Sequence, residues 1–146
     1  MATPAGIVDR ATLTIARLHR ALEHTPDTEL TLPHYRVLGL LAAGDERASV
    51  LASRLAVSRP TVTALVDSLV ERGFVTREPG TSDRRSITVS ITADGRAAVA
   101  ATGVALRATL DAVLAGCADR TVVDAALEQL APALDLWFTA RTAAKG

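Results

Sequence analysis

The sequence predicts a mainly α-helical fold with one small β-hairpin. Apolar residues recur at helical spacing over most of the 146 residues. Between residues 86 and 91 this spacing gives way to strict alternation of apolar and polar residues, which is typical of a half-buried strand. Turn-forming residues at 79–83 separate this stretch from a strand-like run that precedes them. Since 49% of the residues are apolar, the chain can bury one compact core.

Three helices are predicted in the first third of the chain. The first covers about residues 7–22 and carries an apolar stripe along one side. The second begins after Thr31, which is a suitable N-cap, tolerates Pro33 in its first turn and ends at Gly44. A short third helix covers about residues 48–55.

A fourth helix follows after a very short turn. Ser58 can cap it and Pro60 is tolerated in its first turn, while Gly73 ends it. Its apolar stripe consists of Val62, Leu65, Val66 and Leu69. Two helices joined by so short a turn must cross steeply, as they do in a helix-turn-helix.

A hairpin comes next. One strand is expected at about residues 74–78, and a second strand places Ile87, Val89 and Ile91 on one buried face. A two-stranded hairpin is not stable alone, so it must pack on the preceding helices. A helix-turn-helix followed by a packed hairpin is a winged helix-turn-helix.

Two further helices complete the chain. Thr92 can cap a long helix that reaches about Leu114, and a last helix covers about residues 122–139. The first and last helices carry more apolar surface than one winged-helix core needs, and pairing them across a two-fold axis would bury it. The alternative is that they only cap their own domain.

The predicted fold is therefore a winged helix-turn-helix with N- and C-terminal dimerisation helices. Its parts are an N-terminal dimerisation helix at residues 1–30, a winged helix-turn-helix DNA-binding region at 31–96 and C-terminal dimerisation helices at 97–146. Together they form one domain, and a homodimer is expected.

Composition argues against several other classes of protein. The sequence has no glycine-rich phosphate loop, no metal-ligand spacing and no nucleophile elbow, so we expect no enzyme, no cofactor and no metal. The first twenty residues do not resemble a secretory signal. Arg107 and Asp111 interrupt the most hydrophobic stretch, so we expect no membrane span and a cytoplasmic location. The net charge of zero counts against a nucleic-acid partner, which makes the local placement of arginine decisive.

Several stretches together resemble the multiple antibiotic resistance regulator (MarR) family. They are Leu51-Ala52 to Leu55, Val57-Ser58-Arg59-Pro60-Thr61-Val62-Thr63, Leu69 to Gly73-Phe74-Val75, Asp83-Arg84-Arg85, and Val89-Ser90-Ile91-Thr92 with Gly95. The resemblance is most specific over residues 47–96. It implies a homodimeric repressor that binds a palindromic operator in double-stranded DNA and is released by a small-molecule ligand. One departure is Ala56, where the family often has glycine.

The start of the fourth helix carries the candidate major-groove contacts, because a recognition helix directs its N-terminal turn toward the bases. Ser58 and the free backbone N–H groups suit a phosphate, and Arg59 can reach a guanine edge or a phosphate. Pro60 lies on the same outward side, and Thr61 and Thr63 offer a hydroxyl and a methyl group. The alternative is that these residues only begin a helix and remain solvated.

The hairpin tip carries the candidate minor-groove contacts. The resemblance implies that Arg85 enters the minor groove, and Asp83 can hold its guanidinium in one orientation. Arg84 and Arg77 are expected to contact phosphates. The alternative is a solvated tip with a weak surface ion pair.

The resemblance also implies a small aromatic or lipophilic anionic effector, bound between the dimerisation and DNA-binding parts. His34, Tyr35 and Arg36 on the second helix lie in that region of the sequence, although an ordinary helix surface is the alternative. Two rival functions stay open. One is a winged-helix protein-interaction module, which the zero net charge favours, and the other is a ligand-independent DNA-binding regulator.

Overall fold

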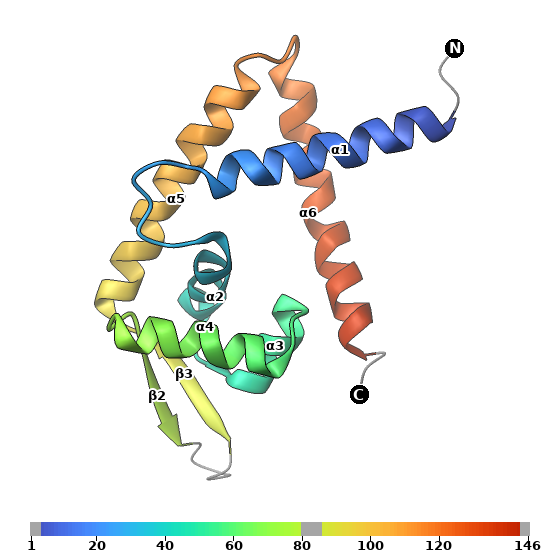
Figure 1. The fold of residues 1–146 in the computed structure, drawn as a ribbon. Helices are drawn as coiled ribbons and strands as arrows, with labels where there is room; N and C mark the ends of the chain where they lie inside the picture. Colours follow the sequence, from blue (N-terminus) through green and yellow to red (C-terminus); the bar gives the residue numbers. More distant parts are fainter. Residues whose placement is uncertain (1–3, 80–85, 144–146) are drawn as a thin grey trace.

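The computed structural model describes residues 4–79 and 86–143. Within these ranges the helices are α1 (Pro4–Glu23), α2 (Leu32–Ala43), α3 (Ala48–Leu55), α4 (Arg59–Glu71), α5 (Ala93–Leu114) and α6 (Arg120–Ala143), and the strands are β1 (Glu46–Arg47), β2 (Val75–Pro79) and β3 (Ile87–Ile91). The predicted order of helices and hairpin is confirmed. Figure 1 shows α5 and α6 meeting at one end of the molecule and diverging toward the other elements, with α1 lying across them. We call α1, α5 and α6 the stalk, and α2–α4 with the three strands the head.

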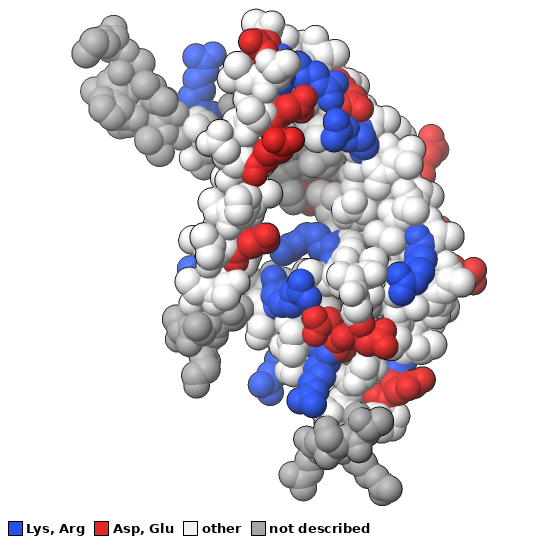
Figure 2. Space-filling view, turned by 180° about the vertical axis from the view of Figure 1, so that it is seen from behind, with Lys and Arg blue, Asp and Glu red and all other residues white. Residues whose placement is uncertain are grey.

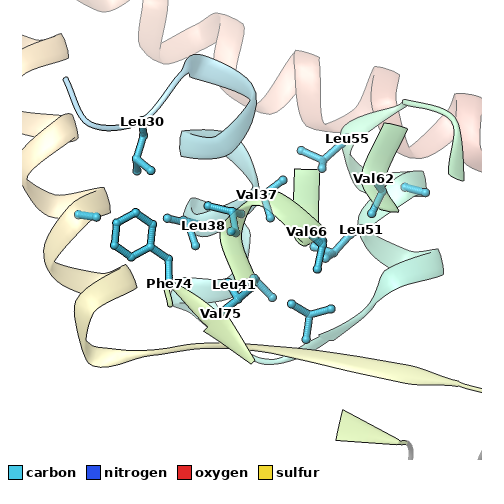
Figure 3. Packing of buried hydrophobic residues seen from close by; sticks show 14 residues of the cluster. Leu30, Val37, Leu38, Leu41, Leu51, Leu55, Val62, Val66, Phe74 and Val75 are labelled. Carbon is cyan, nitrogen blue, oxygen red and sulfur yellow. The ribbon is translucent and has the colours of Figure 1, made fainter. Parts of the chain in front are cut away.

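The hydrophobic core lies inside the head. Figure 3 shows the apolar side chains of α2, α3, α4 and β2 converging on one another. Its largest fully buried members are Val37, Leu38, Leu41, Leu51, Val62, Val66, Leu69 and Val89. The predicted stripe on α4 is confirmed, because Val62, Val66 and Leu69 are at most 1% exposed. This burial holds α4 with its opposite face toward solvent.

The sheet has three strands in the order β1-β3-β2, all antiparallel. The sequence analysis missed β1, since a two-residue strand has no periodicity; Glu46 pairs with Val89 across it. The prediction that Ile87 shares a buried face with Val89 is wrong, because Ile87 is 46% exposed and Val89 is fully buried. The reason is distance from the head: Ile87 pairs with Pro79 at the outer end of the hairpin, beyond the helices.

A tight junction joins α4, the hairpin and α5. Gly73 follows α4 with φ of +73°, and the Phe74 N–H donates to the carbonyl of Leu69 at 2.9 Å. The Thr92 hydroxyl donates to the carbonyl of Gly73 at 2.7 Å and accepts from the Gly95 N–H at 3.0 Å. The predicted cap at Thr92 is therefore confirmed. A Cβ on Gly95 would overlap the Phe74 carbonyl oxygen, so the first turn of α5 rests directly on the backbone of the head.

Ion pairs join α5 to α6 near the turn between them. Asp111 accepts from Arg107 Nε at 3.2 Å and from Arg120, which also donates to Asp124 at 3.2 Å. The hydrogen bond from Arg120 is the main reason that the pKa of Asp111 lies below its usual range. Because these side chains are exposed, the pairs orient the two helices more than they stabilise the fold.

The α5 helix corrects one expectation. It is long and apolar enough, by length and composition alone, to cross a membrane, so the expectation that no apolar run reaches that length was wrong. Arg107 and Asp111 both lie within the helix, but two charges do not lower its mean hydropathy enough to exclude it. One such helix is weak evidence, since a helix of a globular protein can pass the same test. Here α5 packs on the head: its Gly103 leaves room for the Tyr35 ring of α2.

Candidate nucleic-acid interface

The N-terminus of α4 is capped as the sequence predicts. Ser58 has extended backbone angles, and its Oγ accepts the Thr61 N–H at 3.2 Å. The Ser58 and Thr61 hydroxyls also bond to each other at 2.7 Å. Pro60 lies in the first turn, where its missing N–H costs nothing. The first turn is thus preorganised before any ligand binds.

The outward face of α4 carries the other candidate contacts. Arg59, Pro60, Thr61 and Thr63 are all exposed, because the opposite stripe is buried in the head. The Thr63 hydroxyl donates to the carbonyl of Arg59 at 3.0 Å, so it can still accept a hydrogen bond from a base or water. The structure brings these residues together in the exposed N-terminal part of α4, while their contacts with DNA stay a prediction.

Arg77 on β2 has partners on α4. Its guanidinium forms an ion pair with the Asp67 carboxylate and donates to the carbonyl of Thr63 at 3.4 Å. Sequence reasoning assigned Arg77 to a phosphate and did not pair it with Asp67, since the two residues come together only when the hairpin packs on α4. The phosphate contact of Arg77 stays a prediction.

The wing-tip candidates lie outside the described residues. Asp83, Arg84 and Arg85 fall between Pro79 and Ser86, so their assigned roles stay predictions. Among the described residues, Pro79 and Ile87 form the outermost pair of the hairpin. Figure 1 shows the hairpin projecting from the head beside α4.

Charge is mixed over the surface. Figure 2 shows basic and acidic side chains interspersed on one face, which agrees with the net charge of zero. Several arginines are neutralised by close partners: Arg54 pairs with Glu46 at 2.7 Å and Arg72 with Glu29 at 3.5 Å. By contrast, Arg59 is exposed and forms no ion pair with any of the described side chains. A DNA contact must therefore depend on the placement of single arginines.

The three candidate ligand residues on α2 do not form one site. His34 shares a hydrogen bond with the Thr31 hydroxyl at 2.8 Å, while Arg36 donates to the carbonyl of Leu55 at 3.3 Å. Tyr35 lies against Gly103 of α5. Consecutive helical residues point about 100° apart, so the three side chains reach different neighbours. Partial burial, and then the charge of Arg72, lower the pKa of His34 and favour its neutral form.

Arg36 lies next to a cavity that the sequence did not reveal. The cavity has a volume of about 230 Å³ and is lined by Leu40, Arg54, Asp135, Phe138 and Thr139. It opens between α6 and helices α2 and α3 of the head. The Arg36 guanidinium lies 5.9 Å from the centre of the Phe138 ring. Arg54 is paired with Glu46 and the lining includes the Asp135 carboxylate, so Arg36 and the Phe138 ring are the features that suit an aromatic anion.

Comparison with known proteins agrees with this geometry. Residues 28–86 match the model of the MarR family. The chain is 41% identical over 66 residues to the HTH-type transcriptional repressor YetL of Bacillus subtilis (strain 168), covering 43% of this chain and 40% of the relative. It is 33% identical over 93 residues to the uncharacterized HTH-type transcriptional regulator ML2140 of Mycobacterium leprae (strain TN), covering 62% and 65%. The matches thus span less than two thirds of either relative.

Solved structures extend the likeness to nearly the whole chain. The transcriptional repressor CouR, solved bound to a 23-mer DNA duplex, is 29% identical with a TM-score of 0.74, covering 90% of this chain and 92% of that one. CouR from Rhodococcus jostii RHA1, bound to p-coumaroyl-CoA, shares the fold at 22% identity and a TM-score of 0.70, covering 85% and 88%. The capped helix, the hairpin and the long α5 agree with these matches: residues 28–86 match the MarR family, and the fold of the chain is that of winged-helix MarR regulators.

Proposed function

We propose that the protein is a sequence-specific regulator of transcription that binds double-stranded DNA, and that it is not an enzyme. It acts as a cytoplasmic homodimeric repressor on a palindromic operator. Residues 31–96 bind DNA, while residues 1–30 and 97–146 form the dimer. The observation that carries the proposal is the preorganised N-terminus of α4, which exposes Arg59 and Thr63 beside a projecting hairpin. A protein of the same fold is bound to DNA in this family.

The proposed contacts divide between two grooves. Ser58, Arg59, Pro60, Thr61 and Thr63 face the major groove, with the free N–H groups at the start of α4 directed at a phosphate. At the wing tip Arg85 enters the minor groove, Asp83 orients it and Arg84 contacts the backbone. The proposed contacts at the tip rest on the sequence and on family resemblance.

The stalk supports the dimer. Nine of its large apolar side chains are between 44% and 73% exposed in the single chain: Leu13, Ile15, Val104, Val113, Val122, Leu130, Leu134, Leu136 and Trp137. Monomers rarely expose so much apolar surface in one region. A second copy would bury it and would also present two copies of α4 to one duplex.

The experiment is a selection of bound duplexes from a random pool, with the mass of the protein measured in solution. We expect a palindrome, the mass of a dimer and affinity that falls steeply with salt. Arg59→Ala and Arg85→Ala should each weaken binding by about 1–3 kcal/mol per half-site and leave the fold intact. Arg17→Ala, an exposed charge on α1, is the matched control and should change little. A monomer that prefers no duplex sequence would exclude this function in favour of a protein-interaction module.

A second proposal concerns regulation by a small molecule, and the cavity beside Phe138 favours it. An aromatic acid would stack on Phe138 and pair with Arg36. Because the cavity lies between α6 and the head, a bound ligand would favour one spacing of the stalk and the head over others. Thermal shifts against aromatic acids test this, with Phe138→Ala as the control. If no acid raises the melting temperature or releases DNA, the protein is a ligand-independent regulator.

A further inference from the structure

The contact between β2 and α4 links the two parts of the chain that are proposed to read DNA. Arg77 lies on β2, and its partners Asp67 and the Thr63 carbonyl lie one turn apart on α4. The side chains of Arg77 and Asp67 are 32% and 49% exposed, so the pair lies at the surface and above the core. We call this contact the Asp67–Arg77 bridge.

The bridge lies where apolar anchoring of the hairpin ends. At the base of the hairpin Val75 is 2% exposed and Val89, the register partner of Arg77, is fully buried. Beyond Arg77 the described residues Glu78, Pro79 and Ile87 are exposed. At this boundary Arg77 ties the hairpin to α4 through its side-chain hydrogen bonds. Pro79, the last described residue of β2, lies about 7 Å of strand beyond Arg77.

The location of Asp67 sets up an electrostatic conflict. Its carboxylate lies one turn from Thr63, on the outward side of α4 that is proposed to face DNA. A carboxylate near phosphates opposes binding, and Arg77 offsets that charge only while the two are paired. Simple charge counting therefore predicts that removing Asp67 strengthens binding and frees Arg77 to contact a phosphate.

We propose the opposite: Asp67 is a positioning residue that holds Arg77 on α4 and so sets the wing relative to the recognition helix. Arg77 then acts through the position of the hairpin and does not neutralise a phosphate. This inference rests on the proposed function and adds a determinant of DNA recognition to it. Loss of an exposed pair of this kind should lower DNA affinity about threefold for one subunit. In a two-fold dimer the pair occurs twice, so the affinity should fall about tenfold.

The test compares Asp67→Ala with Glu71→Ala in the full chain on the selected duplex. Glu71 is exposed one turn further along α4 and has no ion pair among the described residues, so both variants remove one negative charge and add a good helix former. We expect Glu71→Ala to bind as well as the unchanged protein or slightly better, and Asp67→Ala to bind about tenfold more weakly. Asp67→Ala binding as tightly as Glu71→Ala, or more tightly, overturns the proposal.

Arg77→Ala supplies a second criterion. If Arg77 positions the wing, removing its side chain weakens binding but leaves the salt dependence unchanged, and the double variant with Asp67→Ala is no weaker than Arg77→Ala alone. If Arg77 instead neutralises a phosphate, the slope of log affinity against log salt becomes shallower by about one for each phosphate left unneutralised, which overturns the proposal. Thermal unfolding shows that each variant is folded under the binding conditions.

Hydrogen exchange without DNA separates this inference from the proposed function. The bridge predicts faster exchange at residues 75–79 and 87–91 in Asp67→Ala than in Glu71→Ala. If the unchanged protein binds no duplex, the proposed function fails while exchange still decides whether Asp67 holds the hairpin. Equal exchange in the two variants overturns the positioning role in either case.

Discussion

Gly95 offers a direct test of how closely the stalk is joined to the head. A Cβ at this position would overlap the carbonyl oxygen of Phe74 and come within 2.9 Å of Ile91 Cγ1. The Phe74 carbonyl already accepts the Thr92 N–H at 3.0 Å, so it cannot turn away without breaking that bond. Gly95→Ala must therefore move the start of α5 as a whole.

The expected cost follows from the nature of the clash. Overpacking against a fixed backbone costs about 3 kcal/mol, the upper end of the usual range. For a chain of this length, that lowers the melting temperature by about 10 °C. DNA affinity should fall as well, because the same junction orients α4 through Phe74 and Gly73.

Two other helical glycines provide matched controls. A Cβ at Gly39, on the exposed side of α2, would meet nothing within 4 Å, so Gly39→Ala should stabilise the protein by about 0.5–1 kcal/mol. At Gly103 the nearest atom is the Tyr35 Oη at 3.3 Å, the end of a side chain that can shift, so we expect only a small change.

The assay is thermal unfolding followed by circular dichroism, with all variants at one protein concentration because dimerisation makes the midpoint concentration-dependent. Operator affinity is measured on the same samples. If Gly95→Ala melts within about 2 °C of the unchanged chain, the substitution costs less than about 1 kcal/mol. That result would refute the close approach of Gly95 to the Phe74 carbonyl.

Two further predictions concern a strained backbone position and a titratable side chain. Ala56 ends α3 in the left-handed region with φ of 55°, so Ala56→Gly should raise the free energy of unfolding by up to about 1 kcal/mol in urea denaturation, and a decrease in stability would contradict the strain. Burial and the charge of Arg72 lower the pKa of His34 in the folded chain. In the unfolded chain His34 has the ordinary histidine pKa of about 6.5, so near that pH the unfolded chain binds more protons than the folded chain. The free energy of unfolding should therefore fall as the pH drops from about 6.5 toward the lower pKa of the folded state. His34→Asn should show a smaller fall, and the same dependence of unfolding free energy on pH in the two proteins would contradict this.

Local chemistry explains which parts of the fold the sequence could predict. The caps at Ser58 and Thr92 involve a side chain and a backbone N–H three residues later, so the pattern alone identified them. The buried stripe of α4 follows from helical spacing, and it also determined which side of α4 faces outward. Ala56 could be recognised as a departure from the family, and its left-handed backbone is one that favours glycine.

Contacts between distant segments could not be predicted in this way. The strand β1 exists only because Glu46 pairs with Val89, and Arg77 meets Asp67 only after the hairpin packs on α4. The cavity beside Phe138 likewise joins side chains from α2, α3 and α6. Sequence spacing carries no signal for such pairs, since nothing in the pattern says how far each element is rotated against the next.

By itself, the amino-acid sequence determined the type and order of the helices and the hairpin, because their periodicity and caps are properties of neighbouring residues. The tertiary structure alone decided which arginines are occupied: Arg77 is held by Asp67, whereas Arg59 stands exposed at the start of α4. The physical reason is that an ion pair depends on the distance between two charges, and that distance is set by packing in the core and not by separation along the chain.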